Sequence, residues 1–177
     1  NILHILFLTW NIGHPSTPPS FSAGFEHIKN NYSDLIIINL QEIDKRSNIF
    51  NGQCKKAMNI YVSIIINEFP NYNLYNSLNF QSVALFVLIN KQTKFKNITK
   101  RSNRFVKLKA DGKASIISTF LVNNKTISVI GNHFQFDTQN FDERNFEWLN
   151  AAYDLIFETD FIILLGDLNY RIELSRE

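Results

Sequence analysis

Four apolar segments of this 177-residue chain are each followed closely by a polar side chain that could bind a cation or a phosphate group. In chain order these side chains are Asn11, Glu42, His133 and Asp167, with Asn169 two residues further on. Groups at the ends of buried strands are held rigidly and yet stay exposed, as a catalytic site requires. The set predicts hydrolysis of a phosphate ester at a divalent cation.

Phosphate-ester hydrolysis requires neutralised phosphoryl oxygens, an activated water and a stabilised leaving group. Mg²⁺ suits the first and last of these tasks, and it takes only one or two carboxylates from most proteins. We therefore expect Mg²⁺ as the cofactor, with Glu42 as its ligand and Asn11 beside it. Asp167 could orient the attacking water, whereas His133, as a cation, and Asn169 could hold phosphate oxygens.

Each of these residues also has a structural interpretation when it is taken alone. Glu42 could be a solvated loop residue, and Asn11 could be a turn former. His133 could be a buried histidine with satisfied hydrogen bonds, and Asp167 could cap a turn. Their joint occurrence at the ends of strands is what favours a catalytic site.

The hydrophobic pattern places these residues on an α/β scaffold. Strands are predicted at 3–9, 35–39, 72–78, 82–89, 95–100, 113–122, 126–131 and 161–165, and helices at 21–31, 53–69 and 142–157. The last helix is expected to bury Phe146, Leu149, Ala152, Tyr153 and Ile156. Strands that first alternate with helices and then form hairpins predict mixed sheets covered by helices. We expect a four-layer α/β sandwich with two mixed sheets flanked by helices and the polar residues at one rim.

The composition limits the classes of function. With 45% apolar residues the chain can form a packed core, and its length fits one domain over 1–177. A net charge of +2 does not call for a nucleic-acid partner, and the lone Cys54 fits a reducing, cytoplasmic compartment. No apolar run reaches the roughly 20 residues of a membrane helix. The basic stretch 91–109 predicts either a solvated strand face or a surface for anionic substrate or the headgroups of an anionic membrane.

Several motifs resemble those of the inositol polyphosphate 5-phosphatases, which belong to the endonuclease/exonuclease/phosphatase superfamily with the DNase I-like fold. They are Thr9-Trp10-Asn11, Gln41-Glu42, Asn132-His133-Phe134 and Gly166-Asp167-Leu168-Asn169-Tyr170-Arg171. Asp-x-Asn is common to the superfamily, whereas Tyr170-Arg171 favours the 5-phosphatases over abasic-site endonucleases and sphingomyelinases. Asp111-Gly112-Lys113-Ala114 also stands where the family has Gly-Asn-Lys-Gly, and Glu143-Arg144-Asn145 matches its Glu-Arg-Asn.

The resemblance implies a Mg²⁺-dependent enzyme that removes the 5-phosphate from phosphoinositides or soluble inositol polyphosphates. The implied site comprises the metal ligands Asn11 and Glu42, the phosphate ligands His133 and Asn169, the water-orienting Asp167, and the substrate-binding Lys113, Arg144 and Asn145. Lys113 fits a solvated strand end equally well, and Arg144 and Asn145 fit an exposed first helical turn.

The sequence departs from the family pattern in three places. Ala114-Ser115 replaces the glycine pair after the family lysine, which is a tolerable change. Gly131-Asn132-His133-Phe134 replaces the usual Asn-Ser-His-Leu, so the hydroxyl before the histidine is lost. The family's Pro-Ala-Trp-x-Asp-Arg segment and final Ser-Asp-His have no counterpart, so we expect a catalytic domain truncated at its C-terminus. Two alternatives stay open, namely an inactive phosphate-binding module without the final Asp-His and a nuclease or sphingomyelinase of the same superfamily.

Overall fold

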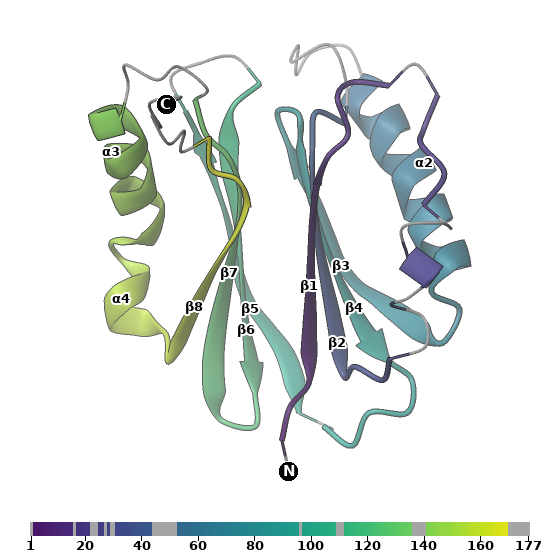
Figure 1. Cartoon of the computed structure of the whole chain (residues 1–177). Helices are drawn as coiled ribbons and strands as arrows, with labels where there is room; N and C mark the ends of the chain where they lie inside the picture. Colours follow the sequence, from purple (N-terminus) through teal and green to yellow (C-terminus); the bar gives the residue numbers. More distant parts are fainter. Residues whose placement is uncertain are drawn as a thin grey trace, which may run out of the picture.

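The computed structural model describes residues 2–15, 17–21, 25–26, 28, 31–43, 53–95, 97–108, 112–135 and 141–169, without the side chains of 53–55 and 141. In this part of the chain, strands form two four-stranded sheets that pack face to face. Helices cover the outer face of each sheet (Figure 1). Each sheet contains both parallel and antiparallel pairs. The predicted four-layer α/β sandwich is confirmed.

The first sheet has the order β1 (Ile5–Asn11), β2 (Leu35–Gln41), β4 (Val83–Asn90) and β3 (Tyr72–Phe80). β1 and β2 are parallel, whereas β4 runs antiparallel to both β2 and β3. Helix α2 (Gln53–Glu68) lies on the outer face of this sheet. Every residue of β2 is buried, because the helix covers one of its faces and the second sheet covers the other.

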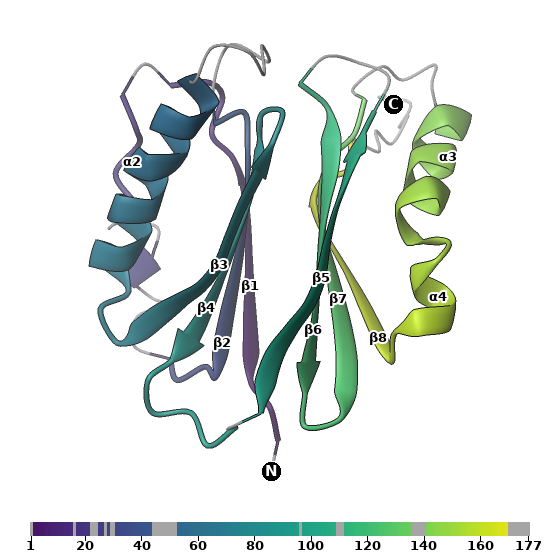
Figure 2. The same ribbon diagram turned by 180° about the vertical axis from the view of Figure 1, so that it is seen from behind.

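The second sheet has the order β5 (Ile98–Lys107), β6 (Ala114–Val122), β7 (Lys125–His133) and β8 (Phe161–Asp167). Its parallel pair is β7 and β8, and its hairpins join β5 to β6 and β6 to β7. Helices α3 (Phe141–Ala152) and α4 (Leu155–Glu158) cover its outer face (Figure 2). Among the described residues, no helix combines the length and the apolar character needed to cross a membrane.

The two parallel pairs bring four strand ends to the same rim of the sandwich. β1 is in register with β2 from Ile5 with Leu35 to Asn11 with Gln41, and β7 is in register with β8 up to His133 with Asp167. All four strands therefore end at the upper rim in Figure 1. The carboxyl ends of parallel strands are where open α/β sheets bind their ligands, so this rim is where a site is expected.

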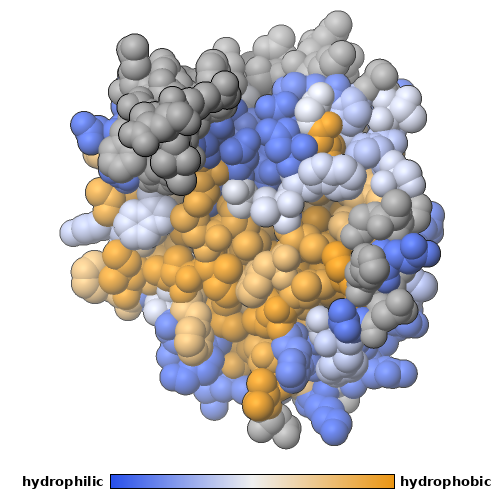
Figure 3. All heavy atoms as spheres, in the orientation of Figure 1, coloured by the Kyte–Doolittle hydropathy of each residue, from blue (hydrophilic) through white to orange (hydrophobic). Residues whose placement is uncertain are grey.

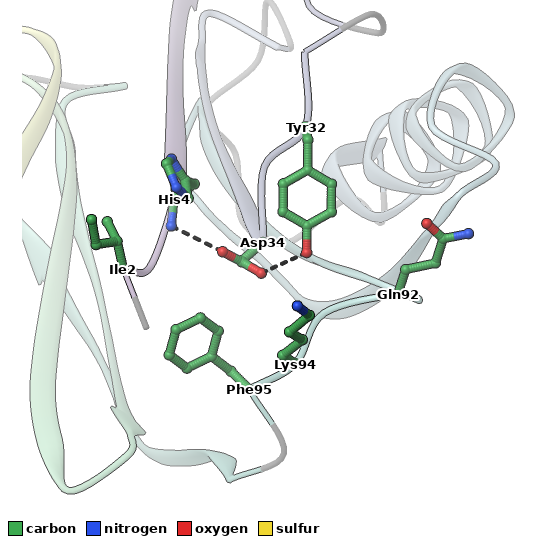
Figure 4. Close-up of a pocket in the computed structure, with 7 residues that line it drawn as sticks. All are labelled: Ile2, His4, Tyr32, Asp34, Gln92, Lys94 and Phe95. Atoms are coloured by element: carbon green, nitrogen blue, oxygen red, sulfur yellow. Dashed lines mark hydrogen bonds between the residues drawn. The ribbon is translucent and has the colours of Figure 1, made fainter.

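At the opposite end of the sandwich, Asp34 links several segments through hydrogen bonds. Its carboxylate accepts hydrogen bonds from the His4 backbone N–H (3.0 Å) and from the hydroxyls of Tyr32 (2.8 Å) and Thr93 (2.7 Å). Although burial opposes it, these hydrogen bonds lower the pKa of Asp34. A cavity of about 400 Å³ opens there, lined by Ile2, His4, Tyr32, Asp34, Gln92, Lys94 and Phe95 (Figure 4). Asp34 thus ties the starts of β1 and β2 to the turn after β4.

Strands β1 and β8 are edge strands on the same side of the molecule, and they are less buried than their neighbours β2 and β7. The face that they share carries a broad apolar band (Figure 3). Trp10 on β1 and Phe161 on β8 are among the exposed large hydrophobic side chains of the described residues. By contrast, the edge strand β5 exposes charged residues such as Lys100 and Arg101, which protect an edge against pairing with another chain.

Two predicted elements need correction. The strand expected at 95–100 lies at Ile98–Lys107, because the charged residues of β5 belong to an exposed edge rather than to a loop. The helix expected at 142–157 is interrupted after Ala152.

The predicted buried stripe of that helix is wrong for all its members except Ala152. Phe146 is 64% exposed and Tyr153 is 62% exposed, and Leu149 and Ile156 are also exposed. The buried residues are Arg144, Glu147, Ala151, Ala152 and Leu155. This second set also has helical spacing, and it turns two charged side chains toward the second sheet.

Candidate active site

Five of the predicted residues converge at the rim where the parallel pairs end. Asn11 is the last residue of β1, and Glu42 directly follows β2. His133 and Asp167 are the last residues of β7 and β8, and Lys113 directly precedes β6. The rim therefore collects side chains from both sheets.

Contacts between the side chains join these residues into one cluster. Asn11 Nδ2 donates a hydrogen bond to Asp167 Oδ2 (3.0 Å), which links the first sheet to the second. His133 Nε2 lies 3.7 Å from Glu42 Oε1 and 3.8 Å from Asp167 Oδ2. Lys113 Nζ contacts the same imidazole nitrogen. Two carboxylates, an amide, an amine and an imidazole thus share one site.

Sharp backbone turns place several of these groups. Glu42 has a φ of 59° and Asn169 a φ of 51°, both in the left-handed region that side chains rarely adopt. His14 lies there too, with a φ of 52°. Such conformations persist where the surrounding structure fixes them, and they are concentrated at functional sites.

The side chains of Asn39 and Gln41 form a buried group of amides near the end of β2, close to Glu42 in the chain. Asn39 Nδ2 donates to the Ala84 carbonyl (3.0 Å), and Asn39 Oδ1 accepts from Gln41 Nε2 (2.5 Å). A Cβ atom on Gly131 would lie 2.6 Å from Asn39 Nδ2. The Asn39 side chain therefore fills the space that a side chain at position 131 would need, which accounts for the glycine there.

Asn132 stands where the family pattern has a serine. Its Oδ1 accepts a hydrogen bond from Ser115 Oγ (2.6 Å), and its Nδ2 donates to the Leu165 carbonyl (3.1 Å). The side chain thus bridges β7 to β6 on one side and to β8 on the other. These bonds hold together the strand ends that carry His133 and Asp167.

Burial is the largest cause of the pKa shifts of two basic side chains, Lys113 and His133. Burial lowers the pKa of Lys113, although Glu42, Asp167 and Glu147 act in the opposite direction. Burial, and then the nearby Lys113, lower the pKa of His133 to about 4. His133 is therefore neutral at neutral pH, which corrects the expectation of a cation there. A neutral imidazole can accept a hydrogen bond from the Lys113 ammonium group.

We expect this low pKa to make the protein less stable in mild acid. The pKa of His133 is about 4 in the folded protein against an ordinary value of 6.5, so the unfolded chain takes up the proton first. The free energy of unfolding should therefore fall between pH 6.5 and 4 by up to about 3 kcal/mol from this residue. The free energy of unfolding, measured with urea across this range, should depend less on pH in His133→Gln than in the wild-type protein. Equal pH dependences in the two proteins would contradict the assignment.

The remaining predicted residues surround the cluster. Asn169 Nδ2 donates to the Phe134 carbonyl (2.7 Å), so its amide holds the loop after β7. Arg144 is 1% exposed on α3, with Nη1 3.5 Å from the Gln135 carbonyl. Asn145 is half-buried beside it. Their contact with substrate stays a prediction, and Asp111, Tyr170 and Arg171 lie outside the described residues.

The donor atoms at the rim fit a hard divalent cation. The carboxylates of Glu42 and Asp167 are both partly exposed and lie 3.7 and 3.8 Å from a neutral imidazole. Lys113 is the basic group that interacts with both, so one lysine faces two carboxylates and their negative charge is incompletely balanced. Within the described ranges, no group of three or more His, Cys, Asp or Glu side chains forms a ready-made metal centre. A cation bound by Glu42 and Asn11 would complete its coordination with water or substrate, as Mg²⁺ commonly does.

Sequence reasoning missed His14 as a neighbour of this site. Its Nε2 lies 3.5 Å from Glu42 Oε2, and its backbone N–H donates to the Glu42 carbonyl (2.9 Å). The available signal was its position three residues after Asn11, because the loop that leaves β1 has little length in which to turn away from the rim.

Comparison with known families matches residues 8–177 to the endonuclease/exonuclease/phosphatase family 2. The chain belongs to this family. The resemblance drawn from the motifs is thereby confirmed, and the fold is that of a hydrolase superfamily. No curated protein matches the chain by sequence.

Solved structures of this fold are similar over most of the chain. The inositol polyphosphate 5-phosphatase domain of SPsynaptojanin, in complex with inositol (1,4)-bisphosphate and calcium ion, has a TM-score of 0.77 at 18% identity. The match covers 98% of this chain and 54% of that one, so the chain spans about half of that length. D. rerio TDP2 with a single-strand DNA product has a TM-score of 0.60 at 13% identity, over 96% and 62% of the two chains. Cimex nitrophorin has a TM-score of 0.55 at 17% identity, over 98% and 62%.

Proposed function

We propose that this chain belongs to a Mg²⁺-dependent phosphatase that removes the 5-phosphate from phosphoinositides or soluble inositol polyphosphates. The observation that carries the proposal is the convergence of Asn11, Glu42, His133 and Asp167 from four strand ends onto one rim. The Asp-Leu-Asn-Tyr-Arg motif that begins at Asp167 favours a phosphatase of inositol phosphates within the family. The likeness to a domain crystallised with inositol (1,4)-bisphosphate supports the same substrate class.

The side chains at the rim have separate tasks in this reaction. Asp167, fixed by its hydrogen bond from Asn11, orients the attacking water and accepts its proton. Lys113 brings positive charge to the non-bridging oxygens, where it neutralises the phosphate. The negative charge of an arriving phosphate raises the pKa of His133, so that its imidazole can donate to the same group. When bound at Glu42 and Asn11, Mg²⁺ supplies charge neutralisation at the phosphoryl and leaving oxygens.

The test is phosphate release by the full-length protein from phosphatidylinositol 4,5-bisphosphate vesicles and from soluble inositol trisphosphate. We expect release that requires Mg²⁺, stops with EDTA and is abolished by Asp167→Asn. Asp154→Asn is the matched control, because Asp154 is an exposed carboxylate that pairs with Arg104. Activity that is indifferent to EDTA, or that survives Asp167→Asn, would overturn the proposal.

A phosphodiesterase acting on DNA is the second candidate, since the fold is also that of D. rerio TDP2 bound to a single-strand DNA product. Adding abasic DNA and sphingomyelin to the substrate panel separates the candidates. Cleavage of either without release from inositol phosphates would replace the proposed substrate class. Binding of inositol phosphates without any release would instead identify the inactive phosphate-binding module.

A further inference from the structure

His14 approaches Glu42 through both its main chain and its side chain. The backbone N–H of His14 donates to the Glu42 carbonyl (2.9 Å), and its Nε2 lies 3.5 Å from Glu42 Oε2. The His14 side chain is 33% exposed, so the ring borders the open rim instead of the core. The proposed mechanism gives this imidazole no task.

Neither the backbone nor hydrogen bonding explains a histidine at this position. Its φ of 52° lies in the left-handed region, where a side chain costs roughly 1–2 kcal/mol relative to glycine. Its Nδ1 is buried and has no hydrogen-bond partner among the described residues. The contact between Nε2 and Glu42 is thus the interaction that distinguishes histidine from the glycine or asparagine that this backbone favours.

The spacing of the two facing atoms fits joint binding of an ion better than a direct hydrogen bond. A good N–H···O bond spans about 2.7–3.2 Å, shorter than the 3.5 Å between Nε2 and Oε2. Two ligand atoms that each lie about 2.1 Å from one ion are about 3 Å apart when the ligand–ion–ligand angle is a right angle. They are somewhat further apart when this angle is wider. The distance between Nε2 and Oε2 falls in this range, and both side chains are partly exposed.

An imidazole changes which cation such a site prefers. Mg²⁺ selects oxygen ligands, whereas transition ions accept imidazole nitrogen. The carboxylate of Glu42 and the amide of Asn11 provide hard oxygen atoms, which suit Mn²⁺ as well as Mg²⁺. Between these two ions, Mn²⁺ therefore matches the whole donor set better than Mg²⁺ does.

We propose that His14 supplies a nitrogen ligand beside Glu42 and shifts the cation preference of this site from Mg²⁺ toward Mn²⁺. The inference rests on the proposed function only in that it places the cation at Glu42.

The test is Mn²⁺ binding to the full-length protein, followed by electron paramagnetic resonance, with Mg²⁺ affinity measured by competition. Pulsed measurements on bound Mn²⁺ should show coupling to a directly bound ¹⁴N nucleus, and His14→Gly should remove it. We expect His14→Gly to weaken Mn²⁺ binding about tenfold and Mg²⁺ binding by less than about twofold. His14→Gly should fold normally, because glycine suits the φ at this position.

Two other histidines serve as controls. His4→Gln, at the opposite end of the sandwich, should leave both affinities and the ¹⁴N coupling unchanged. His133→Gln tests the other imidazole that lies near Glu42, and the coupling should persist in this variant. Coupling that survives His14→Gly, or equal losses of Mn²⁺ and Mg²⁺ affinity, would overturn the inference.

Glu42→Ala separates a failure of this inference from a failure of the proposed function. Loss of Mn²⁺ binding in Glu42→Ala, with no effect of His14→Gly, would reject the ligand role of His14 and leave the metal site at Glu42 standing. Unchanged Mn²⁺ binding in Glu42→Ala would reject both.

Discussion

Glu42→Gln is expected to lower kcat/KM for inositol phosphate hydrolysis by about 10³-fold. Glu42 faces His133 at 3.7 Å and is partly exposed at the rim, so the change removes a charge without opening a cavity. Glutamine keeps the size of the side chain and loses only the carboxylate that would bind the cation. Initial rates of phosphate release at saturating Mg²⁺, together with Mg²⁺ titrations, measure the effect.

The stability of Glu42→Gln should change little, and this distinguishes a catalytic effect from a folding defect. Surface substitutions that create no cavity usually alter the free energy of unfolding by less than about 0.5 kcal/mol. Asp154→Asn, the exposed carboxylate on the outer side of the second sheet, should keep its full rate. A Glu42→Gln enzyme within threefold of the wild-type rate would show that this carboxylate is not the metal ligand.

Gly166→Ala is expected to lower the free energy of unfolding by about 4 kcal/mol. A Cβ atom there would lie 2.1 Å from the Asn132 carbonyl oxygen and 2.7 Å from Asn39 Oδ1. Gly166 also has a φ of 123°, in a region that favours glycine. The backbone cannot move aside easily, because Asn132 and Gly166 are paired in the ladder between β7 and β8.

Gly13→Ala is the matched control, since Gly13 also has a positive φ, of 68°, but a Cβ atom there would meet nothing within 4 Å. Gly13→Ala should therefore lower the free energy of unfolding only by the backbone strain, about 1 kcal/mol. Urea unfolding of both variants measures the difference. Equal decreases in the free energy of unfolding of Gly166→Ala and Gly13→Ala would show that the contacts with Asn132 and Asn39 do not constrain Gly166.

The strand ends were predictable because they follow from local hydrophobicity. A short apolar run that stops at a polar residue predicts a buried strand and its exit, and Glu42 and Asp167 were located in this way. The family motifs then grouped them with residues of the other strands, such as Asn11 and His133.

The buried face of α3 was not predictable from the same kind of pattern. Phe146 and Tyr153 fit one helical stripe, while Arg144, Glu147 and Ala151 fit another with the same spacing. Hydrophobicity favours the first stripe, but the sheet contacts the second. The choice depends on how the helix is rotated against the second sheet, and that rotation is a property of the packed structure.

The charge state of His133 could not be predicted from the sequence either. A histidine after a strand has an ordinary pKa unless its surroundings change it, and the sequence does not reveal burial or a lysine 20 residues away. The contact between Lys113 and His133 exists only because β6 and β7 pair in antiparallel register.

The sequence by itself determined most of the strands, the polar residues at the ends of four of them and the family to which the chain is similar. The tertiary structure alone decided that His14 faces Glu42, that Arg144 and Glu147 are buried, and that His133 is neutral. The physical reason is that hydrophobic periodicity is local along the chain, whereas burial, charge coupling and proximity arise between segments that only the packing of two sheets brings together.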